Sequence, residues 1–227
     1  TIAPLVGAIC AGNCAVVKPS AYSPHTTKVM ADMLRELFQE KYIAVVEGGR
    51  QENQALLNEK FDYIFFTGSV NVGKYVMEKA SAHLTPVSLE LGGKSANIIF
   101  NDCNWEAAID GVQLGILFNQ GQVCCAGSRV FVQEDIYDKF VAELVNAFQH
   151  INVGDPLNPE TQMGAQINRH QADKILSYVQ IAKEEGATIA CGGDYYTENG
   201  CEKGSFVQPT LITNVTNDMR VAQEEIF

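Results

Sequence analysis

The chain has 227 residues, of which 46% are hydrophobic and 19% are charged. This composition supplies one large core or two moderate domains, and it excludes intrinsic disorder, collagen-like repeats and low-complexity classes. Sixteen Lys and Arg against 27 Asp and Glu give a formal net charge of −11, which argues against binding to the phosphate backbone of nucleic acids. Because the sequence starts at Thr1 without Met and stops at Phe227, we expect a piece of a longer polypeptide.

The uncharged segment 1–17 is too short for a membrane span, which takes roughly 20 apolar residues, and it lacks the basic start of a signal sequence. We therefore expect no membrane association. The seven cysteines are an odd number in a chain too large to need disulfide staples, so we expect reduced thiols and a cytoplasmic location. No spacing of Cys and His matches a zinc site, and no metal is expected.

In the first part of the chain, short runs rich in β-branched and aromatic residues predict buried strands over 15–17, 42–46, 63–66, 87–89 and 97–100. Helical patterns over 25–39 and 70–80 lie between them. In the first helix, Val29, Met33 and Leu37 recur every four residues, with Met30 and Leu34 beside them, and predict an apolar stripe that packs on a sheet. This alternation of strands and helices predicts a parallel α/β sheet.

After about Gly92 the pattern changes slightly. The pattern predicts helices over 105–119, 136–148 and 168–185, strands over 128–132 and 187–191, and a turn-rich connection over 153–159. No internal repeat is present. We expect two α/β units with a hinge near residues 91–94.

Two side chains have contexts that suit catalysis. Cys124 follows a bend at Gly121 and is flanked by small residues, so its sulfur is open to a substrate; the alternative is a buried structural cysteine. Glu90 lies between Leu89 and Leu91, where loss of water makes a carboxylate a stronger base. The alternative for Glu90 is a capped or ion-paired carboxylate with Lys94 as its partner.

The segment 65–69 is a strand that runs into a Gly-Ser turn and then a helix. The backbone N–H groups and dipole at such a helix start can receive a phosphate, although ordinary strand-to-helix turns have the same sequence pattern.

Together these segments resemble the NAD(P)-dependent aldehyde dehydrogenase superfamily, and the resemblance covers the whole chain. The glutamate signature at 89–95 and the cysteine signature at 119–124 place Glu90 and Cys124 34 positions apart, as in the family. The segment 16–20 resembles the family's adenine-ribose strand, 66–73 its phosphate-facing turn, and 224–227 the segment that reaches the nicotinamide ribose.

The resemblance implies an α/β fold with a Rossmann-like cofactor-binding domain and an α/β catalytic domain of the aldehyde dehydrogenase type. Residues 1–91 would form part of the NAD(P)-binding domain, and 92–227 most of the catalytic domain, whose C-terminal end returns toward the cofactor. The implied partner is a small-molecule aldehyde, and the implied assembly is a homodimer or homotetramer.

The resemblance also implies a mechanism. Cys124 attacks the aldehyde, a hydride passes to NAD or NADP, and Glu90 activates the water that hydrolyses the resulting thioester to a carboxylic acid. The backbone N–H of Cys124 supplies one oxyanion donor. The residues implied in cofactor binding are Lys18, Ser20, Gly68, Ser69, Val72, Gly73, Leu91, Glu225 and Phe227.

Two features differ from the family pattern. Ala21 stands where NAD-preferring members often carry a glutamate, so use of both NAD and NADP is expected. The family's second oxyanion donor, an asparagine, is expected just before Thr1. Two alternatives follow: a truncated or relic enzyme with only a nucleotide-binding or structural role, and a CoA-acylating aldehyde dehydrogenase. Members of the acylating type commonly lack the glutamate seen here as Glu90.

Overall fold

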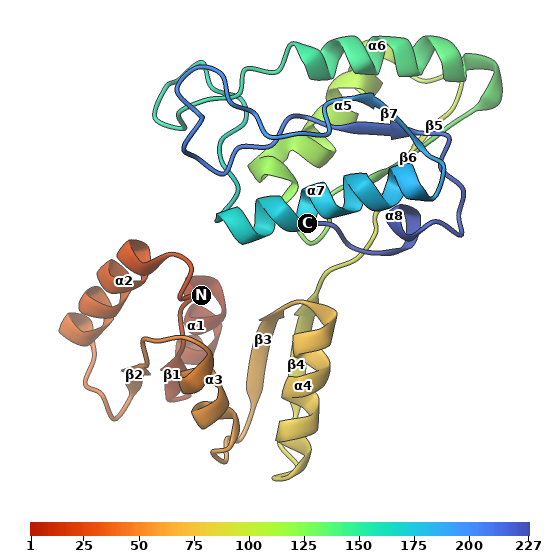
Figure 1. Ribbon diagram of the computed structural model, residues 1–227. Coiled ribbons are helices and arrows are strands. Elements are labelled where there is room, and N and C mark those ends of the chain that lie inside the picture. The colour runs from red at the N-terminus through yellow and green to blue at the C-terminus, as the bar shows by residue number, and fades with distance from the viewer. The chain divides into compact units, whose positions relative to one another are not determined.

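The computed structural model describes residues 1–227 and separates after Leu91 into two units, Thr1–Leu91 and Gly92–Phe227. Figure 1 shows the elements of each unit in chain order, and each unit is described by itself. That residues 1–91 bind the cofactor and residues 92–227 carry out catalysis remains a prediction.

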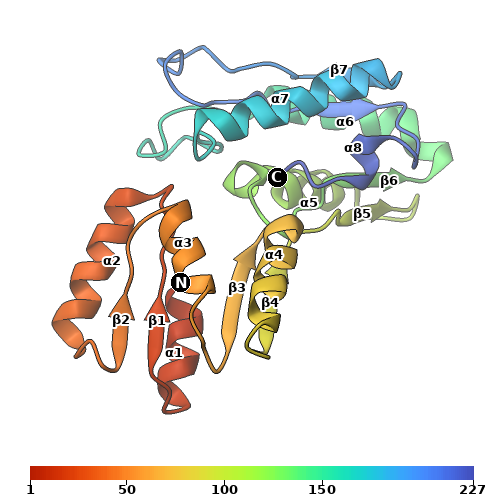
Figure 2. The same ribbon diagram turned by 60° about the horizontal axis from the view of Figure 1, so that its bottom comes forward.

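The first unit alternates helices and strands. Its elements are α1 (Ile2–Cys10), β1 (Ala15–Val17), α2 (Pro24–Leu37), β2 (Ile43–Val45), α3 (Arg50–Leu57), β3 (Ile64–Gly68), α4 (Val70–Ser81) and β4 (Val87–Leu91). β1 pairs in parallel with β2, and β3 pairs in parallel with β4. A helix joins the strands of each pair, as a parallel connection requires. Figure 2 shows α2 beside β2 and α4 beside β4, which their contacts confirm.

The small core of the first unit lies between α1, α2 and the β1–β2 pair. Its buried members are Leu5, Val17, Leu34 and Ile43. Each comes from a different element, so this core fixes how the two helices lie on the two strands. α1 and α3 were not predicted from the sequence.

The face of α2 that packs on the strands overlaps the predicted one only at Leu34. Its buried residues are Thr27, Ala31 and Leu34, whereas Val29, Met33 and Leu37 are exposed. The small side chains of Thr27 and Ala31 let the helix approach the strands closely, which bulkier residues would prevent. The predicted stripe is therefore wrong for Val29, Met33 and Leu37, whereas Leu34, which was predicted beside them, is buried in the core.

The second unit has the following elements: β5 (Ala96–Ile99), α5 (Trp105–Leu117), a 3-10 turn (Phe118–Gly121), β6 (Arg129–Val132), a 3-10 turn (Glu134–Ile136), α6 (Tyr137–Gln149), α7 (Arg169–Glu184), β7 (Thr188–Cys191), β8 (Leu211–Thr213) and α8 (Arg220–Gln223). β5 pairs in parallel with β6, but β7 pairs antiparallel with β8. No helix lies between β7 and β8, so the chain returns by a loop and runs in the opposite direction. The strand β8 was not predicted from the sequence.

Bulky side chains of α6 form the centre of the second core. Phe140, Leu144 and Phe148 are buried there against Val112 of α5. The ring of Trp105 meets Phe140 edge to face, with ring centroids 5.4 Å apart. This arrangement ties α5 to α6 beneath β5 and β6.

All seven cysteines are free thiols, and Cys124 and Cys125 are among the exposed ones. No helix of the chain is both long and apolar enough to cross a membrane.

Candidate active site

A sharp left-handed turn after α5 leads to Cys124. Asn119, Gln120 and Gly121 have φ angles of 49°, 59° and 76°, in the region that L side chains rarely adopt. Asn119 and Gln122 bond to each other, with the Asn119 Nδ2 donating to the Gln122 carbonyl at 3.0 Å. At Gly121 a Cβ would lie 3.1 Å from the Ile116 carbonyl oxygen, so glycine suits this position. The turn thus reverses the chain within a few residues.

Cys124 and Cys125 occupy the two central positions of the next turn, which the Ala126 N–H closes on the Val123 carbonyl at 3.1 Å. Both cysteines are exposed, so the alternative of a buried structural Cys124 is not what the fold adopts. None of the backbone hydrogen bonds that close this loop uses the Cys124 N–H. The thiol and its own N–H are therefore both available to a reacting group.

Asn97 of β5 holds the far end of the same loop. Its Nδ2 donates to the Gly127 carbonyl at 2.9 Å, and the Gly127 N–H donates to the Gly115 carbonyl at 2.9 Å. A Cβ on Gly127 would lie 2.4 Å from the Asn97 Nδ2, so a side chain there would push Asn97 away. Sequence reasoning missed Asn97, although a polar residue within an apolar strand was the available signal.

Glu90 lies inside β4, opposite Thr67 of β3 in the strand register. Its neighbours Leu89 and Leu91 are half-buried, but the Glu90 side chain is exposed. The expected loss of water around this carboxylate is therefore wrong, because the strand directs Glu90 away from the face on which its apolar neighbours pack. An exposed carboxylate of this kind has direct access to water.

The helix α4 starts directly after β3 with Ser69 as its N-cap. The Ser69 Oγ accepts from the Val72 N–H at 3.4 Å, and the Ser69 carbonyl accepts from the Gly73 N–H at 2.9 Å. Ser69 and Val72 are both exposed. The first turn of α4 thus presents backbone N–H groups to solvent at the carboxyl end of a strand, where anions bind in α/β folds.

Gly73 lets α4 lie close to β4, and Gly68 leaves room for a ring of its own strand, β3. A Cβ on Gly73 would lie 2.7 Å from the Leu91 Cδ2, and a Cβ on Gly68 would lie 2.5 Å from the Phe66 ring. Gly68, Gly73 and Leu91 are therefore brought together with Ser69 in one corner of the first unit. The contact of Leu91 with α4 gives that residue a packing role.

Lys18 follows β1 and is half-buried, with its Nζ donating to the Pro19 carbonyl. Burial lowers the pKa of the Lys18 ammonium, and the nearby Glu52 carboxylate partly opposes this change. Ser20 is exposed, and its Oγ accepts from the Tyr22 N–H at 3.2 Å. The two polar side chains lie at the carboxyl end of β1.

Glu225 has a buried carboxylate oxygen, Oε1, without a hydrogen-bond partner. The carboxylate lies against Gly92, where an added Cβ would be only 1.9 Å from that oxygen. The neighbouring Glu224 differs, since Arg220 bonds to it at 2.9 Å and Tyr178 at 2.7 Å. The Arg220 and Tyr178 bonds hold the pKa of Glu224 at about 2. Of the two adjacent glutamates, Glu225 is the one left with a free acceptor.

Lys94 of the second unit carries a positive charge that interacts with Glu225 and Glu224. Burial, reinforced by the charge of Arg129, lowers the pKa of the Lys94 ammonium to about 8, although Glu225 and Glu224 oppose this. The Lys174 Nζ donates to the backbone carbonyl of Glu225 at 3.4 Å. These groups fix the position of Glu225 from several elements. The sequence alone gave Lys94 only as a partner for Glu90.

Phe227 is partly exposed at the end of the described chain. Gln171 of α7 donates from its Nε2 to the Phe227 carbonyl and to the Ile226 carbonyl, the latter at 3.4 Å. The backbone of Glu225 and Phe227 is therefore bonded to side chains of α7. Cys124 lies in the loop after α5 of the same unit.

Comparison with known proteins shows one family throughout. The sequence model of the aldehyde dehydrogenase family matches residues 1–227. The chain is 43% identical over 222 residues to a betaine aldehyde dehydrogenase of Brucella anthropi, a match that covers 97% of this chain and 46% of that protein. The chain thus spans about half the length of the curated relative it matches.

Solved structures agree. A crystal structure of betaine aldehyde dehydrogenase from Staphylococcus aureus in complex with NAD+ matches with a TM-score of 0.90 and 39% identity, over 94% of this chain and 43% of that one. A protein from Burkholderia cenocepacia, provisionally named an aldehyde dehydrogenase, matches with a TM-score of 0.92 and 38% identity, over 97% of this chain and 46% of that one. The α/β fold is that of these enzymes, and the chain belongs to the aldehyde dehydrogenase family.

Proposed function

We propose that this chain carries the nucleophile and the cofactor-binding residues of an NAD(P)-dependent aldehyde dehydrogenase, which oxidises a small-molecule aldehyde to a carboxylic acid. The observation that carries the proposal is Cys124, exposed at the tip of a turn with its own N–H unused, in a chain that matches the family from end to end. The relatives named as betaine aldehyde dehydrogenases support the reaction class.

In the first step the Cys124 thiolate attacks the aldehyde carbonyl, so a carbon–sulfur bond forms and the oxygen takes the negative charge. The N–H of Cys124 is free to donate to that oxygen. Loss of such a donor typically costs about 10²–10³ in rate. Asn97 acts through Gly127, because its hydrogen bond keeps the loop in the conformation that presents both groups.

A bound nicotinamide cofactor would supply the hydride acceptor for the adduct that Cys124 holds. The free Oε1 of Glu225 fits a hydroxyl donor, as a nucleotide ribose offers, because a buried carboxylate oxygen without a partner is costly. The exposed first turn of α4 at Ser69 fits the pyrophosphate, and Lys18 fits the adenosine ribose.

The other residues of the proposed cofactor site are Ser20, Gly68, Val72, Gly73, Leu91 and Phe227. Ala21 offers no carboxylate that would repel a 2′-phosphate, so the proposal includes both NAD and NADP. Both units take part: we propose that residues 1–91 form part of the cofactor-binding domain and supply Glu90, and that residues 92–227 form most of the catalytic domain and return to the cofactor at their C-terminal end.

In the last step Glu90 takes a proton from water, the water oxygen bonds to the thioester carbon, and the carbon–sulfur bond breaks to return the Cys124 thiolate. The exposure of Glu90 supports this role, since a base for water must reach water. The presence of this carboxylate also favours hydrolysis over transfer of the acyl group to coenzyme A. A cytoplasmic location, supported by the free thiols, and a homodimer or homotetramer, supported by the family, complete the proposal.

The test compares two neighbouring cysteines. Cys124→Ser lowers NADH formation from an aldehyde by on the order of 10³-fold or more, because the nucleophile is lost. Cys125→Ser is the matched control, since it changes the other central residue of the same turn and keeps most of the activity. Mass spectrometry of the product, with coenzyme A present, separates free acid from acyl-CoA.

Three results would contradict the proposal. Equal activity of wild type and Cys124→Ser would show that Cys124 is not the nucleophile. Loss of activity in Cys125→Ser alone would assign the nucleophile to Cys125. No NADH from the wild-type chain with any aldehyde would favour a nucleotide-binding or structural role.

A further inference from the structure

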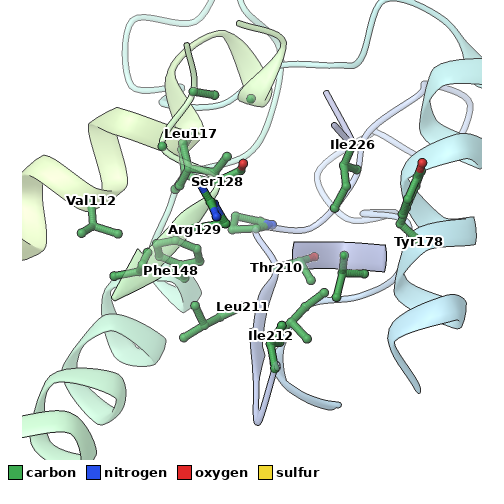
Figure 3. Close-up of a pocket in the computed structure, with 18 of the residues that line it drawn as sticks. Val112, Leu117, Ser128, Arg129, Phe148, Tyr178, Thr210, Leu211, Ile212 and Ile226 are labelled. Atoms are coloured by element: carbon green, nitrogen blue, oxygen red, sulfur yellow. The ribbon is translucent and has the colours of Figure 1, made fainter. Parts of the chain in front are cut away.

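The loop that carries Cys124 is fixed to the second core at its two ends. Leu117, at the end of α5, packs against the core cluster, and Asn97 bonds to Gly127 at the other end of the loop. Figure 3 shows Leu117 and Ser128, the residues that flank the loop, around one pocket of this unit. The positions between these ends need further contacts that hold them in one conformation.

The bend at residues 119–122 has an unfavourable backbone. Asn119 and Gln120 have positive φ angles although neither is glycine, and L residues with a Cβ avoid this region. Residues of this kind persist only where the surrounding structure holds them. The bond between Asn119 and Gln122 lies within the bend, so it cannot fix the bend relative to the rest of the unit. Residues 163–167, the clamp segment, supply contacts from outside.

The clamp segment bonds to the bend at three places. The Gln166 Nε2 donates to the Gln120 carbonyl at 3.2 Å, and the Ile167 N–H donates to the Gln122 Oε1 at 2.9 Å. The Gln120 amide satisfies its neighbours when its own oxygen accepts from the Gly164 N–H at 3.0 Å. The first two pairs are 46 and 45 positions apart in the sequence, so these bonds tie the bend to a distant part of the unit.

The clamp segment is itself held on two sides. Met163 is 3% exposed and forms a parallel bridge with Val153, which is 1% exposed. The Met163 carbonyl accepts from the Gly154 N–H at 3.1 Å. At the other end, the Gln166 N–H donates to the Ser205 carbonyl at 2.9 Å. Because it is buried and bonded to two other segments, the clamp segment is a firm support for the bend.

The Gln166 side chain is 6% exposed, and only one of its two amide atoms is bonded. Its Nε2 donates to Gln120, whereas its Oε1 is buried without a partner in residues 1–227. A buried oxygen of this kind lowers stability, so an unbranched apolar side chain such as methionine would suit this site better for packing alone. The one bond that the amide does make is the bond to the bend before Cys124.

We propose that Gln166 is a positioning residue, which with the clamp segment holds the bend so that the Cys124 thiol and N–H meet the carbonyl of the aldehyde. This inference rests on Cys124 being the nucleophile of the proposed function. Attack on a carbonyl requires a set distance and angle, and small displacements of the reacting atoms cost large factors in rate. Gln166 acts through Gln120, so its loss lowers kcat and leaves the affinity for substrate and cofactor in place.

The test removes the amide and keeps the length of the side chain. Gln166→Met lowers kcat for aldehyde oxidation by about 10–100-fold, whereas KM for the aldehyde and Kd for NAD change by no more than about twofold. In the same protein, the amides of Gln122 and Ala126 exchange hydrogen about 5–10-fold faster, as the loss of one hydrogen bond implies. The melting temperature changes little, because the buried oxygen without a partner is removed as well.

Two comparisons separate positioning from a general loss of structure. Gln162→Met is the matched control, because the Gln162 Oε1 accepts from the Asn152 N–H at 2.9 Å and makes no bond to the bend; it keeps kcat and the exchange rates of the loop. Gln122 provides a second pair of variants. Gln122→Glu keeps an acceptor for the Ile167 N–H and retains more activity than Gln122→Met, which has none.

The proposal fails if Gln162→Met loses as much activity as Gln166→Met, because any weakening of this region would then explain the effect. It also fails if Gln166→Met leaves the exchange of the loop amides unchanged, or if it raises KM with kcat unaltered. Equal activity of the two Gln122 variants would contradict the bond from Ile167. A wild-type chain without activity contradicts the proposed function, and the exchange rates then test the clamp segment alone.

Discussion

The two units cover their strands to different extents. In the first unit, strand residues such as Val16 and Phe65 are 44% and 48% exposed, although they are apolar. In the second unit, Phe140, Leu144 and Phe148 are 0–3% exposed and cover β5 and β6 from one side. Parallel strands are normally covered on both faces. The first unit thus has little core of its own, whereas the second has a bulky core built around α6.

This difference affects where function and stability lie. The second unit holds Cys124 in a loop that is anchored to its core through Asn97 and β5. The first unit offers its proposed phosphate site at the start of α4, on an element whose packing depends on close approach at Gly73. We therefore expect substitutions in the second core to have the largest effects on stability.

The strongest test compares the two cores directly. Phe140→Ala lowers the free energy of unfolding of the second unit by about 3–5 kcal/mol, since it removes a fully buried ring and leaves a cavity. Leu34→Ala in the first unit is the matched core truncation, at about 2–3 kcal/mol, because fewer neighbours surround it. Urea unfolding followed by Trp105 fluorescence reports the second unit alone, as the ring contacts Phe140. A Trp105 transition that moves equally with Leu34→Ala would mean that the two units unfold together.

The sequence predicted helices and strands well where apolar spacing and turn residues agree. α4, α6 and α7 begin and end within about two residues of the expected ranges, because each has an apolar stripe and clear end signals. α3 has no buried residue, so it has no apolar stripe to detect. On α2, the small side chains of Thr27 and Ala31 are buried together with Leu34. The apolar pattern did not predict Thr27 and Ala31, because their small size, and not their hydrophobicity, lets the helix lie close to the strands.

The site was predictable to the extent that it is local in sequence. The bend before Cys124 is encoded by Gly121 and its neighbours, so the exposed thiol was expected. The support from Asn97 and the contact between Gly92 and Glu225 join residues that are far apart in the chain, and no local pattern predicts them. The exposure of Glu90 depends in the same way on which face of β4 is covered.

The next effect concerns the partly buried charge of Lys94 in the second unit. The folded-state pKa of Lys94, about 8, lies below the ordinary value of 10.5, so the unfolded state binds more protons between these pH values. Stability from this group therefore rises with pH through that window, and its full cost applies below pH 8. Lys94→Met is expected to gain about 1–2 kcal/mol over wild type at pH 7, after allowance for partial exposure.

Thermal or urea unfolding at pH 7 and about pH 10 measures this difference, which should shrink at the higher pH. The nearby charges of Arg129, Lys174, Glu224 and Glu225 are unchanged in the variant. Lys203→Met, at an exposed position of the same unit, is the matched control for removal of a lysine. A destabilised Lys94→Met at pH 7 would show that the attraction of the Glu224 and Glu225 charges outweighs the cost of burial.

A smaller effect tests the free oxygen of Glu225. Gly92→Ala places a Cβ where the carboxylate now lies, so Glu225 must move. If the proposed function is correct, the affinity for NAD falls by roughly 10–100-fold, the value of a hydrogen bond to a charged group. Gly111→Ala, where a Cβ meets nothing within 4 Å, is the control and leaves the affinity unchanged. Calorimetric titration measures both, and unaltered binding by Gly92→Ala would exclude Glu225 from the cofactor site.

The smallest effect separates a structural cap from a binding residue. Ser69 caps α4 through a bond of 3.4 Å, whereas Asn168 caps α7 through a bond of 2.9 Å. Ser69→Ala is expected to cost about 0.5 kcal/mol of stability and Asn168→Ala about 1 kcal/mol, because the longer bond is weaker. The order reverses for nucleotide affinity: Ser69→Ala weakens binding several-fold and Asn168→Ala has no effect, since only the start of α4 is proposed to meet the pyrophosphate. Thermal unfolding and titration of the same two proteins give both orders, and parallel losses in stability and affinity would reduce Ser69 to a cap.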